Sequence, residues 1–222
     1  MTRSRKAGYT TLIALAVAGA ATACSDSGPA VAPTQARISI EPGIAQQLAA
    51  GLWASIAGTG TAVSPDTVQS LTIQFTEVAF LPADATEGDE TAWQTLTLPA
   101  TVTLDLMALP TETDGSVEIA SGSVPVGQYK MVRLLVGEGE ITFKGPLSLG
   151  GAVTFDGATA YPVTIPSGSQ SGIKTDVSFE VTEGENATTN AAYLVFAPGT
   201  TFQNLTATGG GGVMLNPVIH AK

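Results

Sequence analysis

Short runs in which apolar and polar side chains alternate limit the folds open to this chain more than any other feature. In the clearest run, residues 173–181, one face would carry Ile173, Val177, Phe179 and Val181, and the other would carry charged and hydroxyl side chains. An extended strand points successive side chains to opposite faces, so this period of two predicts a strand with one buried face. The fold must therefore bury one face of such a strand against a core.

Comparable runs follow one another along the chain, and Gly, Pro, Asp and Ser mark the breaks between them. We expect strands at residues 37–40, 71–76, 93–98, 102–107, 117–120, 129–136, 141–143, 153–155, 161–165, 173–181, 193–196 and 213–219. This pattern predicts an all-β fold, an antiparallel β-sandwich of the immunoglobulin-like or transthyretin-like kind, with a barrel as the alternative. One short helix is expected near residues 43–56, where apolar side chains recur every four residues.

The first 24 residues have the order of an export signal. Basic side chains come first, an uncharged run fills residues 10–20, and Ala21-Thr22-Ala23 lead into Cys24, the only cysteine. The apolar run is shorter than the roughly 20 residues of a membrane-spanning helix but has the length of a signal-peptide core. We therefore expect residues 1–23 to be a signal peptide that is removed on export.

Cys24 resembles the cysteine of the bacterial lipobox, which receives a diacylglycerol and becomes the first residue of the mature protein. The resemblance implies acyl chains on Cys24, the membrane as a partner and a place in the cell envelope. Ser25 favours the outer membrane in a cell that has two. Residues 24–35 would then form a lipidated, flexible tether, and residues 36–222 a single domain. The alternative is an ordinary secretory signal that leaves Cys24 unmodified.

The charge of the mature chain limits its partners. Without the three basic residues of the signal, six basic and 19 acidic side chains remain, which gives a net charge of −13. Nucleic acids and anionic lipid surfaces repel such a chain, so we expect neither as a partner. Envelope proteins and glycans stay open as partners.

Four sequence blocks and a short C-terminal one resemble a known family. They are W-x-T-L from Trp93, the block around Asp105, P-x-G-x-Y-x-x-x-R-L from Pro125, P-S-G-x-Q-S-G-x-K from Pro166, and Asn216-Pro217. Over roughly residues 67–220 they resemble envelope proteins of bacteria and archaea catalogued as a domain of unknown function, DUF4382. The resemblance implies an extracytoplasmic β-sandwich, often lipid-anchored, without an established activity. The motif residues, for which we expect structural roles, are Trp93, Asp105, Pro125, Gly127, Tyr129, Arg133, Pro166, Ser167, Gly168, Gly172, Lys174 and Pro217.

Simple physical roles suit several of these residues. Pro125 and Gly127 favour a tight turn, over which Tyr129 could fold to bond the backbone, as tyrosines do at sandwich corners. Arg133 lies in an otherwise apolar run and needs an anionic or carbonyl partner, for which Asp105 is a candidate. The loop at residues 166–168 is expected to use its hydroxyl groups to cap neighbouring backbone.

The sequence offers little chemistry for catalysis or for metal binding. Ser171 and Lys174 match the S-x-x-K pattern, but the match leads into a strand, which separates the two side chains. The single histidine, His220, and the lack of a free thiol once Cys24 is acylated argue against zinc. Calcium is the one candidate cofactor, because hard oxygen ligands suit it and four carboxylates crowd one stretch. These are Asp84, Glu87, Asp89 and Glu90. A solvated hairpin tip is the simpler interpretation of the same cluster.

Three functions are therefore compared. The leading hypothesis is a lipid-anchored envelope protein with a non-enzymatic binding or structural role. A glycan-binding module is the first alternative, with Tyr161 or Trp93 as an exposed aromatic platform. A serine hydrolase that uses Ser171 and Lys174 is the second, and we do not expect an enzyme.

Overall fold

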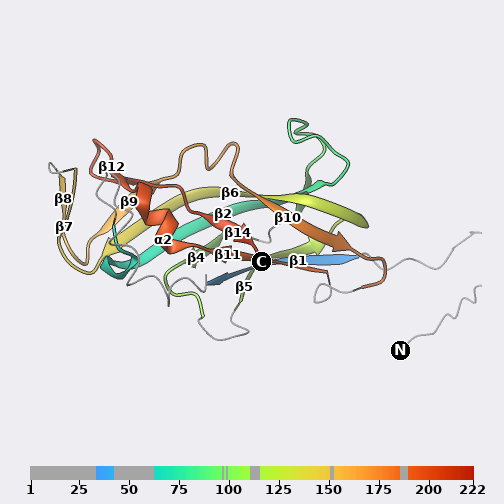
Figure 1. Ribbon diagram of the computed structural model, residues 1–222, viewed down its shortest axis with the longest axis horizontal. Coiled ribbons are helices and arrows are strands. Elements are labelled where there is room, and N and C mark those ends of the chain that lie inside the picture. The colour runs from blue at the N-terminus through green and yellow to red at the C-terminus, as the bar shows by residue number, and fades with distance from the viewer. Residues whose placement is uncertain are drawn as a thin grey trace, which may run out of the picture. The chain divides into compact units, whose positions relative to one another are not determined.

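The computed structural model describes residues 34–42, 63–96, 98, 100–110, 116–150, 153–185 and 190–222 (Figure 1). All of them belong to one compact unit, Ala32–Lys222. Cys24 and the helix expected at residues 43–56 lie outside the described residues. In the part of the chain that is described, no helix has the length and hydrophobicity needed to cross a membrane.

Strands dominate the described residues, so the all-β prediction is confirmed. The strands are β1 (Gln35–Pro42), β2 (Val68–Pro82), β3 (Gln94–Leu96), β4 (Val102–Asp105), β5 (Val117–Ser123), β6 (Gly127–Phe143), β7 (Leu147–Leu149), β8 (Val153–Phe155), β9 (Ala160–Thr164), β10 (Ile173–Val181), β11 (Ala191–Phe196), β12 (Thr206–Ala207), β13 (Val213–Met214) and β14 (Ile219–Ala221). The described helical elements are single turns: η3 (Pro65–Thr67), α2 (Pro198–Thr201) and η4 (Phe202–Asn204).

The long antiparallel pair of β2 and β6 forms the centre of one sheet, which we call sheet B. On its outer side, β6 pairs with β10 at one end and with β9 at the other. The outer side of β2 pairs with β4 and β3 in the same way. Strands β13 and β12 extend the sheet beyond β9. Sheet B therefore has two ends, and β3, β10 and the adjoining halves of β2 and β6 make up one of them.

β6 corrects one expectation, because two strands were expected where a single strand runs. Ile73 pairs with Gly139 and Phe75 pairs with Val136, so three steps along β6 face two steps along β2. The extra residue is a β-bulge, which absorbs the glycine-rich stretch 137–140 without ending the strand. The glycines that suggested a turn mark this bulge instead.

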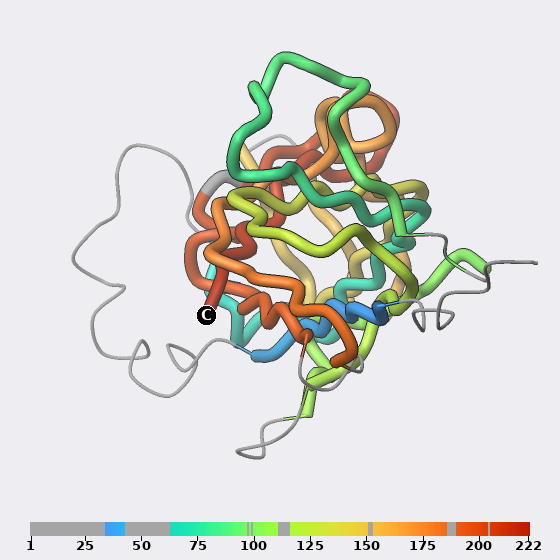
Figure 2. Tube along the Cα trace, turned by 90° about the vertical axis from the view of Figure 1, so that its right-hand side faces the viewer, coloured from blue at the N-terminus to red at the C-terminus, as the bar shows by residue number. Residues whose placement is uncertain are grey.

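The second sheet, sheet A, has the order β14-β11-β1-β5. β1 contains residues 37–40, where the first strand was expected, and lies in the middle, antiparallel to β5 and parallel to β11. A parallel neighbour requires a long connection, and more than a hundred residues separate β1 from β11 along the chain. The two sheets pack as a sandwich, with β1 in one layer and β2 and β6 in the other (Figure 2).

The main core fills the space between the two sheets, because each strand turns its alternate apolar side chains inward. Its fully buried members include Ile38 and Ile40 of β1, Phe80 of β2 and Phe196 of β11. A second, smaller cluster joins Ala79 and Leu81 of β2 to Trp93. These β2 residues alternate with Val78 and Phe80 of the main core, so the second cluster lies on the outer face of sheet B.

Candidate functional site

The small outer cluster is covered by the loop that joins β2 to β3. This loop, residues 83–93, carries the four carboxylates singled out from the sequence, and we call it the acidic loop. It projects from sheet B on the side away from β1 (Figure 2). Trp93 ends the loop and is only 7% exposed, packed against Ala79 and Leu81. Burial of this indole holds the end of the acidic loop against sheet B.

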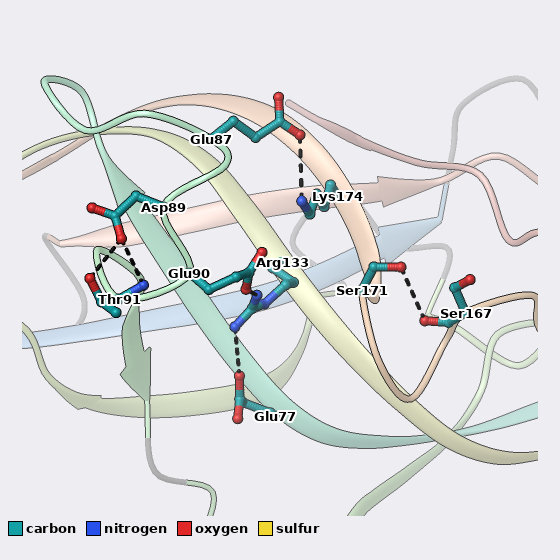
Figure 3. Close-up of polar contacts among 9 residues, drawn as sticks. All are labelled: Glu77, Glu87, Asp89, Glu90, Thr91, Arg133, Ser167, Ser171 and Lys174. Carbon is teal, nitrogen blue, oxygen red and sulfur yellow. Dashed lines mark hydrogen bonds and ion pairs between the residues drawn. The ribbon is translucent and has the colours of Figure 1, made fainter.

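Arg133 of β6 lies next to Trp93, with its guanidinium carbon 4.6 Å from the centre of the indole ring. The residue is 8% exposed. Its Nη2 donates to Glu77 of β2 at 3.2 Å, and its Nη1 donates to Glu90 of the acidic loop at 2.5 Å (Figure 3). A buried guanidinium with two carboxylate partners matches the rule that buried charges are paired.

A second cation lies directly opposite Arg133 on the neighbouring strand. Lys174 of β10 is the cross-strand partner of Arg133, and its ammonium lies 5.5 Å from the centre of the Trp93 ring. Like charges directly opposite each other destabilise a sheet unless anions compensate them. Glu87 of the acidic loop supplies one such anion, 3.5 Å from the Lys174 ammonium (Figure 3). We call these residues together (Trp93, Arg133, Lys174, Glu77, Glu87 and Glu90) the Trp93 cluster.

The start of the acidic loop is held by a third basic side chain. The ammonium of Lys130 donates to the backbone carbonyls of Ala83, at 3.1 Å, and Ala85. A hollow of about 390 Å³ lies beside this point, and Asp84, Pro125 and the exposed Val126 contribute to its wall. Both ends of the acidic loop are therefore fixed to sheet B, one by a lysine and the other by a tryptophan.

The expected pairing of Arg133 with Asp105 is wrong. The carboxylate of Asp105 accepts from the backbone N–H groups of Leu71, at 3.0 Å, and Met107, at 2.9 Å, at the end of β4. Asp105 therefore caps a turn. Arg133 instead pairs with Glu77 of β2 and Glu90 of the acidic loop. These contacts depend on the register of β2 against β6 and on the folding of the loop.

The structure does not bring the four loop carboxylates together as a cation site. Glu87 and Glu90 are paired with Lys174 and Arg133, whereas Asp89 accepts from the N–H and the hydroxyl of Thr91. These hydrogen bonds to Thr91 hold the pKa of Asp89 below its usual value. Among the described residues, no group of three His, Cys, Asp or Glu side chains is placed to hold a metal ion.

The aromatic residues considered for glycan binding are both engaged within the domain. Trp93 is buried, so the expectation of an exposed platform there is wrong. Tyr161 of β9 is half-buried, with its ring centre 4.8 Å from that of Phe155. The Tyr161 hydroxyl accepts from the N–H of Asp156 at 2.6 Å.

The expected turn at the start of β6 is confirmed. The hydroxyl of Tyr129 donates to the carbonyl of Pro125 at 2.7 Å, and Gly127 between them has a φ of 151°. The Tyr129 ring is buried against Phe80 and Phe179, with ring centres 5.3 and 6.1 Å away. This tyrosine joins the turn to the main core.

Tyr129→Phe is expected to lower the free energy of unfolding by about 1 kcal/mol, because a partly buried carbonyl loses its donor.

Burial also raises the pKa of the Tyr129 phenol. The unfolded chain then releases this proton at lower pH than the folded one, so the tyrosine's contribution is complete below about pH 10 and declines as pH rises through the folded pKa. Urea unfolding between about pH 8 and pH 11 checks both effects, because stability should fall more steeply in wild type than in Tyr129→Phe. Parallel pH profiles would contradict this.

The motif from Pro166 forms a compact loop that docks on β6. The carbonyl of Ser167 accepts from the backbone N–H groups of Gln170, Ser171 and Gly172 at 2.9–3.1 Å, and the carbonyl of Gly168 accepts from Val136 of β6 at 3.0 Å. The hydroxyl of Ser171 donates to the Ser167 carbonyl at 3.4 Å, so the capping hydroxyl comes from Ser171 and not from residues 166–168, where it was expected. Ser171 and Lys174 therefore have different partners, as Figure 3 shows.

Sequence reasoning found most members of the Trp93 cluster but not their association. Trp93, Arg133 and Lys174 were separate motif residues, Glu87 and Glu90 were candidate calcium ligands, and Glu77 was missed. One signal was present in the sequence, because Arg133 lies between the apolar Val132 and Leu134, and Lys174 directly follows the apolar Ile173. That alternation places both cations on the outer face of the sheet.

Comparison with protein families matches residues 62–217 to the Domain of unknown function (DUF4382). Comparisons with curated proteins and with solved structures found no match. The matched residues cover most of the chain and include the whole Trp93 cluster, whereas β1 and β14 lie outside them. The chain therefore belongs to the DUF4382 family, in agreement with the motifs from Trp93, Pro125 and Pro166.

Proposed function

We propose that this protein is a lipid-anchored, non-enzymatic binding protein of the bacterial cell envelope, placed in the outer membrane where the cell has one. The observation that carries the proposal is the position of Cys24, the sole cysteine, directly after an export signal. A chain with a single thiol has no partner for an internal disulfide, so acylation accounts for a cysteine at this position.

The position of β1 determines how far the domain would lie from an anchor on Cys24. Ten residues separate Cys24 from Gln35, where β1 begins. An extended segment of this length spans at most about 35 Å, so the domain would remain close to the bilayer. β1 then enters the middle of sheet A, between β5 and β11. A pull on the anchor would therefore act directly on the centre of a sheet.

The side chains considered for catalysis support a binding role in preference to hydrolysis. Ser171 bonds its own loop, and Lys174 is paired with Glu87. His220 is exposed on the short strand β14, opposite Val195. The Trp93 cluster instead gathers one buried, two half-buried and two exposed charges on one surface, which is suited to recognition.

Cys24→Ser is expected to abolish incorporation of radiolabelled palmitate and to shift the protein from the membrane to the soluble fraction, because the serine hydroxyl does not accept the diacylglycerol. Ser25→Ala provides the matched control and should keep both the label and the membrane location. Palmitate labelling followed by fractionation measures these outcomes. Equal labelling of wild type and Cys24→Ser would remove the anchor from the proposed function.

A further inference from the structure

The Trp93 cluster contains two cations on adjacent strands in a chain of strong net negative charge. Arg133 and Lys174 face each other across β6 and β10, and both lie within 6 Å of the Trp93 ring centre. Three basic side chains of the domain, including Lys130, gather under the acidic loop. This local positive charge requires anions, and the acidic loop supplies two of them.

The anions that the acidic loop supplies are exposed to solvent. The side chains of Glu90 and Glu87 are 64% and 57% exposed, whereas that of Arg133 is 10% exposed. Ion pairs with a solvent-exposed member contribute little to stability, since water competes for the carboxylate. Arg133 would also keep Glu77 of β2 as a partner if Glu90 moved away. Exchange of the two loop carboxylates for others is therefore compatible with an intact sheet.

Two buried donors in the same cluster have no acceptor. Neither the indole Nε1 of Trp93 nor the Nε of Arg133 has a hydrogen-bond partner among the described residues. Buried polar groups are nearly always satisfied, so a cluster with spare donors is suited to take further oxygen atoms. Both residues are more than nine-tenths buried and contact each other, which places this spare capacity inside the Trp93 cluster.

We propose that Arg133 and Lys174 form a binding site for an acidic segment of a partner protein, and that the acidic loop occupies this site in the free protein. The loop itself indicates the ligand chemistry: two glutamates three residues apart in one loop fit the two cations. Partner carboxylates would replace Glu87 and Glu90, and further oxygens would accept from Trp93 and Arg133. The inference rests on the binding role proposed above and names the partner class.

A peptide copy of the loop tests the site. The probe is a fluorescein-labelled peptide of residues 83–92, with the sequence ADATEGDETA, titrated by fluorescence anisotropy against the full chain carrying Cys24→Ser. In this background the loop of the protein competes with the probe at the high effective concentration of a tethered segment. Adding Glu87→Gln and Glu90→Gln should therefore raise the affinity for the probe at least about tenfold. A further Lys174→Gln should reverse most of that gain.

Matched controls separate binding of the probe carboxylates from unspecific binding and from loss of folding. The probe with glutamine at both glutamate positions should not bind, and binding of the original probe should weaken as salt rises. Lys174 is half-buried rather than buried, and circular dichroism of each variant verifies that it is folded. Equal affinity of the background protein and the Glu87→Gln, Glu90→Gln variant, or binding of the glutamine probe, would overturn the proposal. Tighter binding of an oligogalacturonate of the same charge would overturn the assignment to a protein partner. Because the titration uses protein without an acylated cysteine, it can fail or succeed independently of palmitate labelling.

Discussion

Gly172→Ala is expected to destabilise the domain by about 2–5 kcal/mol. Gly172 has a φ of 67°, a left-handed conformation in which a Cβ costs about 1–2 kcal/mol. A Cβ at this position would also lie 2.6 Å from the carbonyl oxygen of Leu134 on β6. Backbone cannot move aside cheaply, so β10 would have to shift away from β6 at its first residue. Urea unfolding followed by circular dichroism measures the loss.

Gly184→Ala is the matched control for this substitution. Gly184 also has a left-handed conformation, with a φ of 76°, but nothing lies within 4 Å of the position of its Cβ. This variant should lose only about 1 kcal/mol, the cost of the backbone conformation alone. The difference between the two variants therefore isolates the close approach of the Pro166 loop to β6. Equal losses would show that the approach of Gly172 to Leu134 contributes nothing.

Ile38→Ala is expected to cost about 2–5 kcal/mol, and Ile38→Val about 0.5–1.5 kcal/mol. Ile38 is fully buried in the middle of β1, paired with Ala192 of β11 on one side and Ala120 of β5 on the other. Alanines on both neighbouring strands leave room that the isoleucine fills, so truncation would create a cavity in the centre of sheet A. The graded pair of variants, measured by urea unfolding, tests this packing.

The control for Ile38 is Val126, an exposed aliphatic residue in the connection between β5 and β6. Val126 is 56% exposed, and Val126→Ala should change stability by no more than about 0.5 kcal/mol. A small effect of Ile38→Ala, similar to that of Val126→Ala, would mean that β1 is only loosely associated with the domain. How firmly β1 is attached needs its own test, because β1 lies outside the residues matched to DUF4382 and next to the proposed tether.

The strands were the most predictable part of the fold, because alternation records which face of a strand is buried. The expected strand at residues 173–181 has the observed bounds of β10, and its Phe179 and Val181 are buried as predicted. The glycines in β6 were misinterpreted, since a bulge and a turn favour the same residues. The parallel pairing of β1 with β11 joins segments far apart in sequence, so no local pattern predicts it.

The candidate site was less predictable, because it depends on register and on a loop conformation. Tyr129 was correctly assigned to its turn, since its partner Pro125 is four residues away. Arg133 was assigned the wrong carboxylate, since its partners, Glu77 and Glu90, are 56 and 43 residues away. Only the cross-strand pairing of β6 with β10 and the folding of the acidic loop bring Lys174 and Trp93 beside this arginine.

The most direct test of an anchored envelope protein is the intact mass of the protein purified from membranes. We expect a mature chain that begins at Cys24 and carries the added mass of a diacylglyceryl group, with or without a further acyl chain on its amino group. A product that keeps residues 1–23, or that begins at Cys24 without lipid, would contradict the proposed anchor.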